Sequence, residues 1–292
     1  MLFFSQLING LQLGSIYALV ALGYSMVYGI ISLLNFAHGD IIMVGGYIAL
    51  LSLSARLPAP AAIALTIAGC VVLAVVIEKI AYKPLRGAPR ISLLITAIGI
   101  SLLLQNGAQL LFSANAKPFP STLILPGTSL HIGSLNLSIV TIVTIAVSLV
   151  SMLILMLLVG HTRLGKAMRA VSEDADAASL MGINVNSIVS FTFAVGSALA
   201  GVGSVLFCCR YPLVSPSMGA MLGLKAFIAA VLGGIGSIPG AMVGGFAIGL
   251  CEILVTAVGL STWSDGVVFA ILIVVLLARP TGLMGRSVAE KV

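Results

Sequence analysis

Long, uninterrupted runs of apolar residues set the narrowest limit on what this chain can fold into. Nine runs can be drawn: residues 11–31, 41–57, 61–80, 91–112, 137–159, 188–207, 219–235, 241–259 and 267–278. A membrane-spanning helix needs about 20 apolar residues, whereas a membrane-spanning strand shows only a weak polar–apolar alternation. We therefore predict an all-α, polytopic membrane helical bundle with eight or nine transmembrane helices, forming a single domain over residues 1–292.

Charged side chains are too scarce for a water-soluble protein. Only 8% of the residues are Asp, Glu, Lys or Arg, compared with roughly 25% in soluble domains. Disorder and nucleic-acid binding both need many charges, so the same scarcity excludes them. The four cysteines lack metal-ligand spacing, and we expect neither a metal site nor a cofactor.

Basic residues indicate how the chain is oriented. They form three clusters, after the third, fifth and ninth runs: Lys79, Lys83, Arg86 and Arg90; Arg163, Lys166 and Arg169; Arg279, Arg286 and Lys291. Cytoplasmic loops of membrane proteins are enriched in Lys and Arg. Nine crossings with an outer N-terminus put all three clusters inside, and leave Arg56, Lys117 and Arg210 outside.

The longest hydrophilic stretch, about residues 160–187, has the pattern of two short helices. Apolar residues recur every three or four positions from Leu164 to Ala178. Ser172 is the expected N-cap of the second helix, with acidic residues in its first turn, and Gly182 suits its C-terminal end. Such a pair suits docking into a groove on a partner, the alternative being a solvated connection.

Residues 160–167 nearly match the phosphate-binding pattern GxxxxGK[ST], but Ala167 replaces the required hydroxyl residue. An apolar helix, not a strand, precedes them. The chain also lacks GxSxG and HExxH motifs, and none of its three histidines lies within an apolar run. We therefore expect no enzymatic activity.

A polar break separates the first two apolar runs. It contains Asn35, His38, Gly39 and Asp40, of which Gly39 permits a sharp bend and Asp40 begins the next helix. Irregular backbone at membrane depth occurs only where it is buried in protein or lines a water-filled cavity, so the break is a candidate part of a translocation path. A plain cytoplasmic turn capped by Asp40 is the alternative.

Polar residues inside the runs are costly and are usually paired or functional. Lys225 and Glu252 both lie about 9–10 Å from the outer end of their helices. The short turn at 233–240 makes these helices antiparallel, so we predict an ion pair. A lone Lys225 reaching outward and a protonated, hydrogen-bonded Glu252 are the alternatives. Gln105 and Asn106 could either line a substrate path or form hydrogen bonds inside the bundle.

Glycines recur at four-residue steps in the first and eighth runs. They are Gly10 and Gly14, and Gly240, Gly244, Gly245 and Gly249. Small residues on one helical face let two backbones approach closely in a membrane. We expect tight packing within the bundle; a subunit interface or a pore lining is the alternative.

Four segments together resemble the permeases of branched-chain amino acid ABC importers, most closely the H-type permeases of high-affinity systems. They are residues 162–183, which resemble the coupling loop; 35–40; 84–90 with 98–106; and the late glycine turn 233–240. The similarity extends from near residue 10 to about 285. It implies an ABC importer permease fold with a cytoplasmic two-helix coupling loop, in a bacterial inner membrane.

The resemblance also implies partners and a substrate. The partners are a second homologous permease, two cytoplasmic ATP-binding subunits and a periplasmic substrate-binding protein. The substrates would be leucine, isoleucine and valine, with urea or short amides as the alternative; a secondary transporter is disfavoured because only Glu252 could serve as its coupling carboxylate. The expected ATPase-coupling residues are Arg163, Gly165, Arg169, Ala170, Glu173, Asp174, Ala177 and Gly182.

Overall fold

The computed structural model describes residues 2–31, 35–125, 129–132, 135–279 and 281–285. The predicted Arg286 and Lys291 of the third basic cluster lie outside these residues. Within the described chain, seven helices are long and apolar enough to cross a membrane. They are α1 (Leu2–Ile31), α3 (Ala59–Ile77), α4 (Arg90–Phe112), α5 (Ile139–His161), α8 (Val185–Arg210), α10 (Ile238–Ala257) and α11 (Ser264–Ala278).

Two further apolar helices, α2 (His38–Ser54) and α9 (Met218–Gly233), have only 17 and 16 residues, whereas α11 together with the 3-10 turn before it forms an 18-residue span, Ser261–Ala278. They account for the difference between seven long helices and the eight or nine that hydropathy predicts. The helical membrane bundle is confirmed. One boundary differs clearly, because α1 begins at Leu2 rather than near residue 11: its polar first turns lower the local hydropathy without ending the helix.

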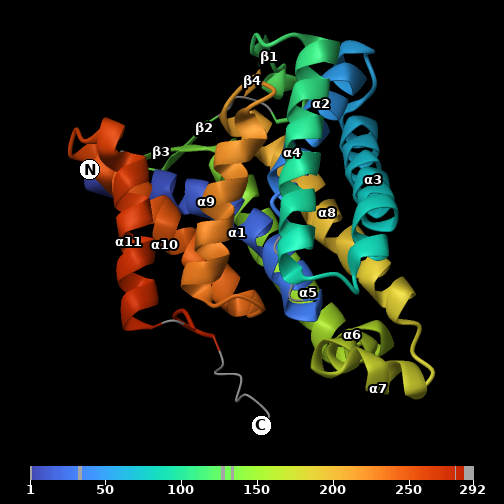
Figure 1. The fold of residues 1–292 in the computed structure, drawn as a ribbon. Helices are drawn as coiled ribbons and strands as arrows, with labels where there is room; N and C mark the ends of the chain where they lie inside the picture. The colour runs from blue at the N-terminus through green and yellow to red at the C-terminus, as the bar shows by residue number, and fades with distance from the viewer. Residues whose placement is uncertain (1, 32–34, 126–128, 133–134, 280, 286–292) are drawn as a thin grey trace.

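Helix α1 lies at the centre of the bundle and packs against α10, α8, α9 and α5. Its span is 83% buried, compared with 11% for α4 and for α11, which lie at the periphery (Figure 1). Glycines bring α1 and α10 together: a Cβ at Gly14 would come within 2.7 Å of Phe246 Cα, and a Cβ at Gly249 would overlap Gly14. The glycine steps therefore serve packing within this bundle.

The apolar helices alternate in direction between two ends of the molecule (Figure 1). At one end, Arg86 Nη1 donates to Asn186 Oδ1 at 2.7 Å, and the two short helices α6 (Arg163–Glu173) and α7 (Ala175–Leu180) follow α5. Leu283 N donates to Leu232 O at 2.9 Å near the chain end. This grouping matches the side predicted to be cytoplasmic.

Short strands lie at the opposite end, the one predicted to be outer and called the outer end below, and hydropathy does not predict them. β1 (Lys117–Pro118) pairs antiparallel with β4 (Leu213–Val214), and β2 (Ser129–Ile132) pairs with β3 (Leu135–Ser138) in a hairpin. Four brief helical turns complete the described structure: a π-helix at Glu78–Tyr82 and 3-10 helices at Lys83–Leu85, Ser121–Leu123 and Ser261–Trp263.

Candidate functional site

The two inner helices α6 and α7 are each capped by a side chain. Thr162 Oγ1 accepts from Gly165 N at 3.0 Å at the start of α6. Asp174 Oδ1 accepts from Asp176 N at 3.0 Å and from Ala177 N at 2.9 Å at the start of α7. The prediction that Ser172 caps the second helix is wrong: α6 continues past it, and its hydroxyl donates to Arg169 O at 2.8 Å. Ser and Asp are similarly good caps, so this local choice was not decided by residue type.

Helix α6 is attached closely to the end of α5. A Cβ at Gly165 would overlap the carbonyl oxygens of Leu158 and Val159, so only glycine allows this approach. Arg169 Nη1 donates to Val159 O, and to Gly160 O at 3.3 Å, satisfying carbonyls that the end of α5 leaves free. These contacts join α6 directly to the end of α5, one of the seven long apolar helices.

Gly182 ends α7 with a left-handed residue. Its φ is +83°, Gly182 N donates to Ser179 O at 3.0 Å, and Ile183 N donates to Ala178 O at 3.0 Å. These two bonds form the Schellman motif, in which glycine avoids the steric cost of positive φ. A Cβ at this position would meet no neighbour, so the requirement for glycine is conformational.

On the side that faces away from the bundle, α6 and α7 expose both apolar and acidic side chains. Leu180 is 90% exposed and Met181 83% exposed. Among the predicted coupling residues, Arg163, Glu173, Asp174 and Ala177 are exposed and Ala170 is partly buried. Sequence reasoning missed Leu180 and Met181, although two large apolar residues directly before a terminating glycine are a detectable signal.

The polar break lies inside the bundle rather than at its inner surface. A Cβ at Gly23 of α1 would overlap the imidazole of His38, the first residue of α2. Gly23 precedes the last residue of α1, Ile31, by two turns, about 12 Å along the axis. Asn35, His38 and Asp40 are all buried.

Gly39 lets the two short helices approach each other. A Cβ at Gly39 would overlap Gly219 O and come within 2.9 Å of Gly223 Cα, both in the first turns of α9. The start of α2 therefore contacts the start of α9 through backbone atoms.

The polar side chains of the break face other helices. Asn35 Oδ1 accepts from Tyr82 OH at 2.7 Å, and Asp40 Oδ1 accepts from Gln105 Nε2 of α4 at 3.0 Å. Asp40 makes no capping bond to its own helix. Asn106 does not join this group: it is exposed, and its Nδ2 donates to Leu102 O at 2.7 Å within α4.

Three buried polar atoms of the break have no hydrogen-bond partner in the described chain: Asn35 Nδ2, His38 Nε2 and Asp40 Oδ2. Buried polar groups in proteins are nearly always satisfied by protein, water or ligand. Because three such atoms lie within six residues, this region is a candidate site for bound water or a ligand.

Lys225 and Glu252 lie 2.8 Å apart, Nζ to Oε1. Two further residues join them that sequence reasoning missed. Lys225 Nζ also lies 2.7 Å from Asp265 Oδ1, and Tyr17 OH donates to Glu252 Oε2 at 2.7 Å. This charge cluster links α1, α9, α10 and α11. Asp265 lies in the first turn of the last apolar helix, and an acidic residue at that position was the sequence signal that could have identified it.

Another buried charged residue, Glu78, was also missed. Its carboxylate is ion-paired with Arg86 and accepts from Ser190 Oγ at 2.6 Å, joining the inner ends of α3 and α8.

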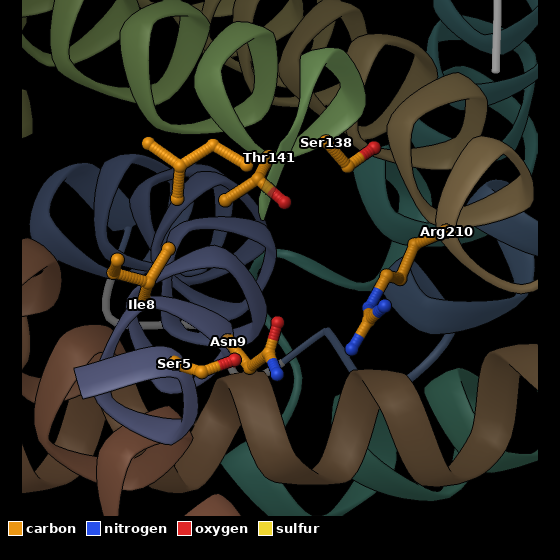
Figure 2. Close-up of a pocket in the computed structure, with 7 residues that line it drawn as sticks. Ser5, Ile8, Asn9, Ser138, Thr141 and Arg210 are labelled. Carbon is orange, nitrogen blue, oxygen red and sulfur yellow. The ribbon is translucent and has the colours of Figure 1, made fainter. Parts of the chain in front are cut away.

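A small polar pocket lies at the outer end, between the starts of α1 and α5 and the end of α8. Its volume is about 80 Å³, and Arg210 extends into it between Ser138 and Asn9 (Figure 2). Arg210 Nε is buried without a hydrogen-bond partner, and no carboxylate in the described residues pairs with this guanidinium.

Comparison with known proteins identifies the family. Residues 6–276 match the model described as branched-chain amino acid transport system / permease component. The chain is 44% identical, over 99% of its length and 98% of the relative's, to the high-affinity branched-chain amino acid transport system permease protein BraD of Pseudomonas aeruginosa. It is 41% identical, over 99% of its length and 98% of the relative's, to LivH of Escherichia coli K12, whose name describes the same function.

A more distant relative is the probable branched-chain amino acid transport permease protein LivH of Methanocaldococcus jannaschii, 30% identical over 93% of this chain and 89% of that protein. No solved structure matched the chain. Since both the family model and the near full-length relatives agree, this multi-pass membrane chain belongs to the branched-chain amino acid transport permease family.

Proposed function

We propose that this chain is the transmembrane subunit of an ABC importer that, with a second homologous permease, forms the path for leucine, isoleucine and valine. The observation that carries the proposal is the near full-length identity to relatives named for branched-chain amino acids. Those names support this substrate class over urea or short amides.

Helices α6 and α7 are the proposed docking element for the ATP-binding subunits. Leu180 and Met181 offer exposed apolar side chains beside the acidic residues at 173–176, which suits insertion into a partner's groove. ATP hydrolysis is then the partners' reaction.

Transport is proposed to follow from coupling between this docking element and the spans. Gly165 and Arg169 hold α6 on α5, and α6 also contacts α1 and α8. Movement of the ATP-binding subunits would be passed to these helices and change access at the break where α2 and α9 meet. Coupling of this kind is a free energy shared between two sites through a two-state bundle.

The outer end suits an acidic partner, proposed to be the substrate-binding protein. Arg56, Lys117 and Arg210 have no carboxylate partner in the described chain, whereas Glu252 and Asp265 are both held by Lys225. Complementary charge guides such docking. The Arg210 pocket, about 80 Å³, is smaller than the roughly 150 Å³ cavity that holds benzene. It therefore fits a carboxylate group better than a whole leucine.

Uptake measurements test the main proposal. Cells lacking this chain should lose uptake of radiolabelled leucine and regain it when the chain is restored, with urea uptake unchanged throughout. Unaltered leucine uptake in the deleted strain, or loss of urea uptake, would contradict the proposed substrate.

The outer docking surface has its own test. Arg210→Gln should weaken binding of the purified substrate-binding protein to the assembled importer by about tenfold, because it removes a charged hydrogen-bond partner. Lys83→Gln, at an exposed position on the inner side and outside the coupling residues, is the control and should leave this binding unchanged. Equal binding by Arg210→Gln and the unaltered protein would refute the role of the pocket.

A further inference from the structure

A groove of about 300 Å³ runs between α2 and α4, outward of the Asp40–Gln105 hydrogen bond. Its lining is almost wholly apolar and includes Val44, Ile48 and Leu51 from α2, and Leu104, Ala108 and Phe112 from α4. The two helices also meet farther outward, where the rings of Tyr47 and Phe112 stack with their centroids 4.2 Å apart, and the groove lies between this stack and the Asp40–Gln105 bond.

Helical periodicity places Asp40 at the inner end of this groove. Asp40, Val44, Tyr47 and Leu51 recur at three- and four-residue intervals along α2, so they share one face. On α4, Gln105 shares a face with Ala108 and Phe112, which also line the groove. Asp40 and Gln105 do not themselves line the groove; their hydrogen bond joins the two helices just inward of it, one turn before Val44 on α2.

The carboxylate of Asp40 has unused acceptor capacity. Asp40 is only 1% exposed; Oδ1 accepts from Gln105, Ser101 lies beside the carboxylate, and Oδ2 has no hydrogen-bond partner among the described residues. Every ion pair found in the described residues lies elsewhere. An acidic group at membrane depth is expensive unless a cation or hydrogen bonds compensate it, so the site is complementary to a positively charged ligand.

We propose that this groove is a substrate-recognition site within the membrane, in which Asp40 Oδ2 binds the α-ammonium group of the amino acid. The branched aliphatic side chain lies between Val44 and Ile48 on one side and Leu104 on the other. Gln105 is a positioning residue that holds the carboxylate through Oδ1. This inference rests on the proposed function and assigns its substrate contacts.

Size and charge distinguish an amino acid from a lipid as the occupant. The groove has about 300 Å³, twice the roughly 150 Å³ that accommodates benzene, which is room for one leucine-sized molecule. A lipid acyl chain would cover the apolar walls but would bring no cation to Asp40. A ligand whose ammonium group lies directly beside its aliphatic group, as in an amino acid, satisfies both parts of the site, whereas the ammonium of an aminophospholipid lies in the headgroup at the membrane surface.

Transport by the complete importer, reconstituted in vesicles with its substrate-binding protein, tests the role of Asp40. Asp40→Asn should lower the maximal rate of leucine uptake more than tenfold and leave KM unchanged, because KM reflects capture by the binding protein. Asp40→Glu, which keeps the charge, should retain at least a third of the rate. Gln109→Leu, which changes an exposed amide on the same helix, should leave the rate unchanged.

The groove walls are tested by substrate preference. Val44→Phe reduces the space for the side chain and should lower the ratio of leucine to valine uptake about fourfold, the discrimination carried by one buried methylene group. A merely structural role of Val44 would lower both rates equally.

Occupancy is tested by photochemistry. Leucine carrying a diazirine should label groove residues of α2 and α4 during turnover, and Asp40→Asn should abolish the labelling. Labelling of these residues by a diazirine-bearing phospholipid but not by the leucine probe would overturn the inference. So would an Asp40→Asn importer that retains more than half the wild-type rate, and in that case the proposed function would stand. If the unaltered importer carried no leucine, the proposed function itself would fail.

Discussion

Replacing Lys225 by methionine should destabilise the bundle more than any other single change in the charge cluster. Lys225 neutralises two carboxylates at once, at 2.8 Å for Glu252 and 2.7 Å for Asp265. The side chains of Lys225 and Glu252 are 11% and 16% exposed, whereas that of Asp265 is 47% exposed. Lys225→Met therefore leaves one nearly buried carboxylate and one half-solvated carboxylate without a cation.

The magnitudes follow from this exposure. Removing one partner of a buried pair costs roughly 3–5 kcal/mol, and the contact to Asp265, screened by water, contributes at most about 1 kcal/mol. Glu252→Gln should cost less than Lys225→Met, because Lys225 keeps Asp265 and the amide still accepts from Tyr17 OH. The double variant should be more stable than Lys225→Met alone, since it contains no stranded buried carboxylate.

Thermal unfolding of the purified permease in detergent measures these differences, with Asp265→Asn as a fourth variant expected to have a small effect. The decisive quantity is the coupling energy from the double-mutant cycle. Strictly additive losses for Lys225→Met and Glu252→Gln would show that the two charges act independently and would refute the pairing argument.

Three further predictions concern the inner helices and the topology. Gly182→Leu should abolish leucine uptake while the permease remains in the membrane, because φ of +83° is strained for any side chain; if uptake and ATPase co-purification both survived, the docking assignment would be wrong. Leu180→Ser combined with Met181→Ser should reduce ATPase co-purification without changing thermal stability, because both side chains are at least 83% exposed. A cysteine at Lys117 should react with an impermeant reagent from outside, whereas one at Arg169 should not; labelling of both from one side would overturn the nine-crossing arrangement.

Sequence alone determined the features that depend on local hydropathy and charge. Apolar runs of membrane-spanning length can form all their backbone hydrogen bonds in lipid only as helices, so the helical bundle follows from composition and spacing. The clusters of Lys and Arg likewise predicted which helix ends lie on the same side of the membrane. Gly182 was identified as a helix end because the preference for glycine at positive φ is a property of one residue.

Local reasoning failed where alternatives differ by little energy. Ser172 and Asp174 are both good N-caps, and the cap fell on Asp174 because α6 extends to Glu173 with Met168 and Val171 buried on its inner face. The early start of α1 has the same origin, since a helix once begun is cheap to extend through polar residues.

Only the tertiary structure decided which distant residues meet. Gln105 lies 65 residues from Asp40, and Glu252 lies 235 residues from Tyr17; spacing along the chain carries no information about either contact. Asp265 joined Lys225, and Arg210 has no carboxylate partner among the described residues beside the start of α1, because of how the helices pack. Side-chain packing in a dense interior selects one arrangement of helices from many with the same hydropathy, and that selection is what brings these polar groups together.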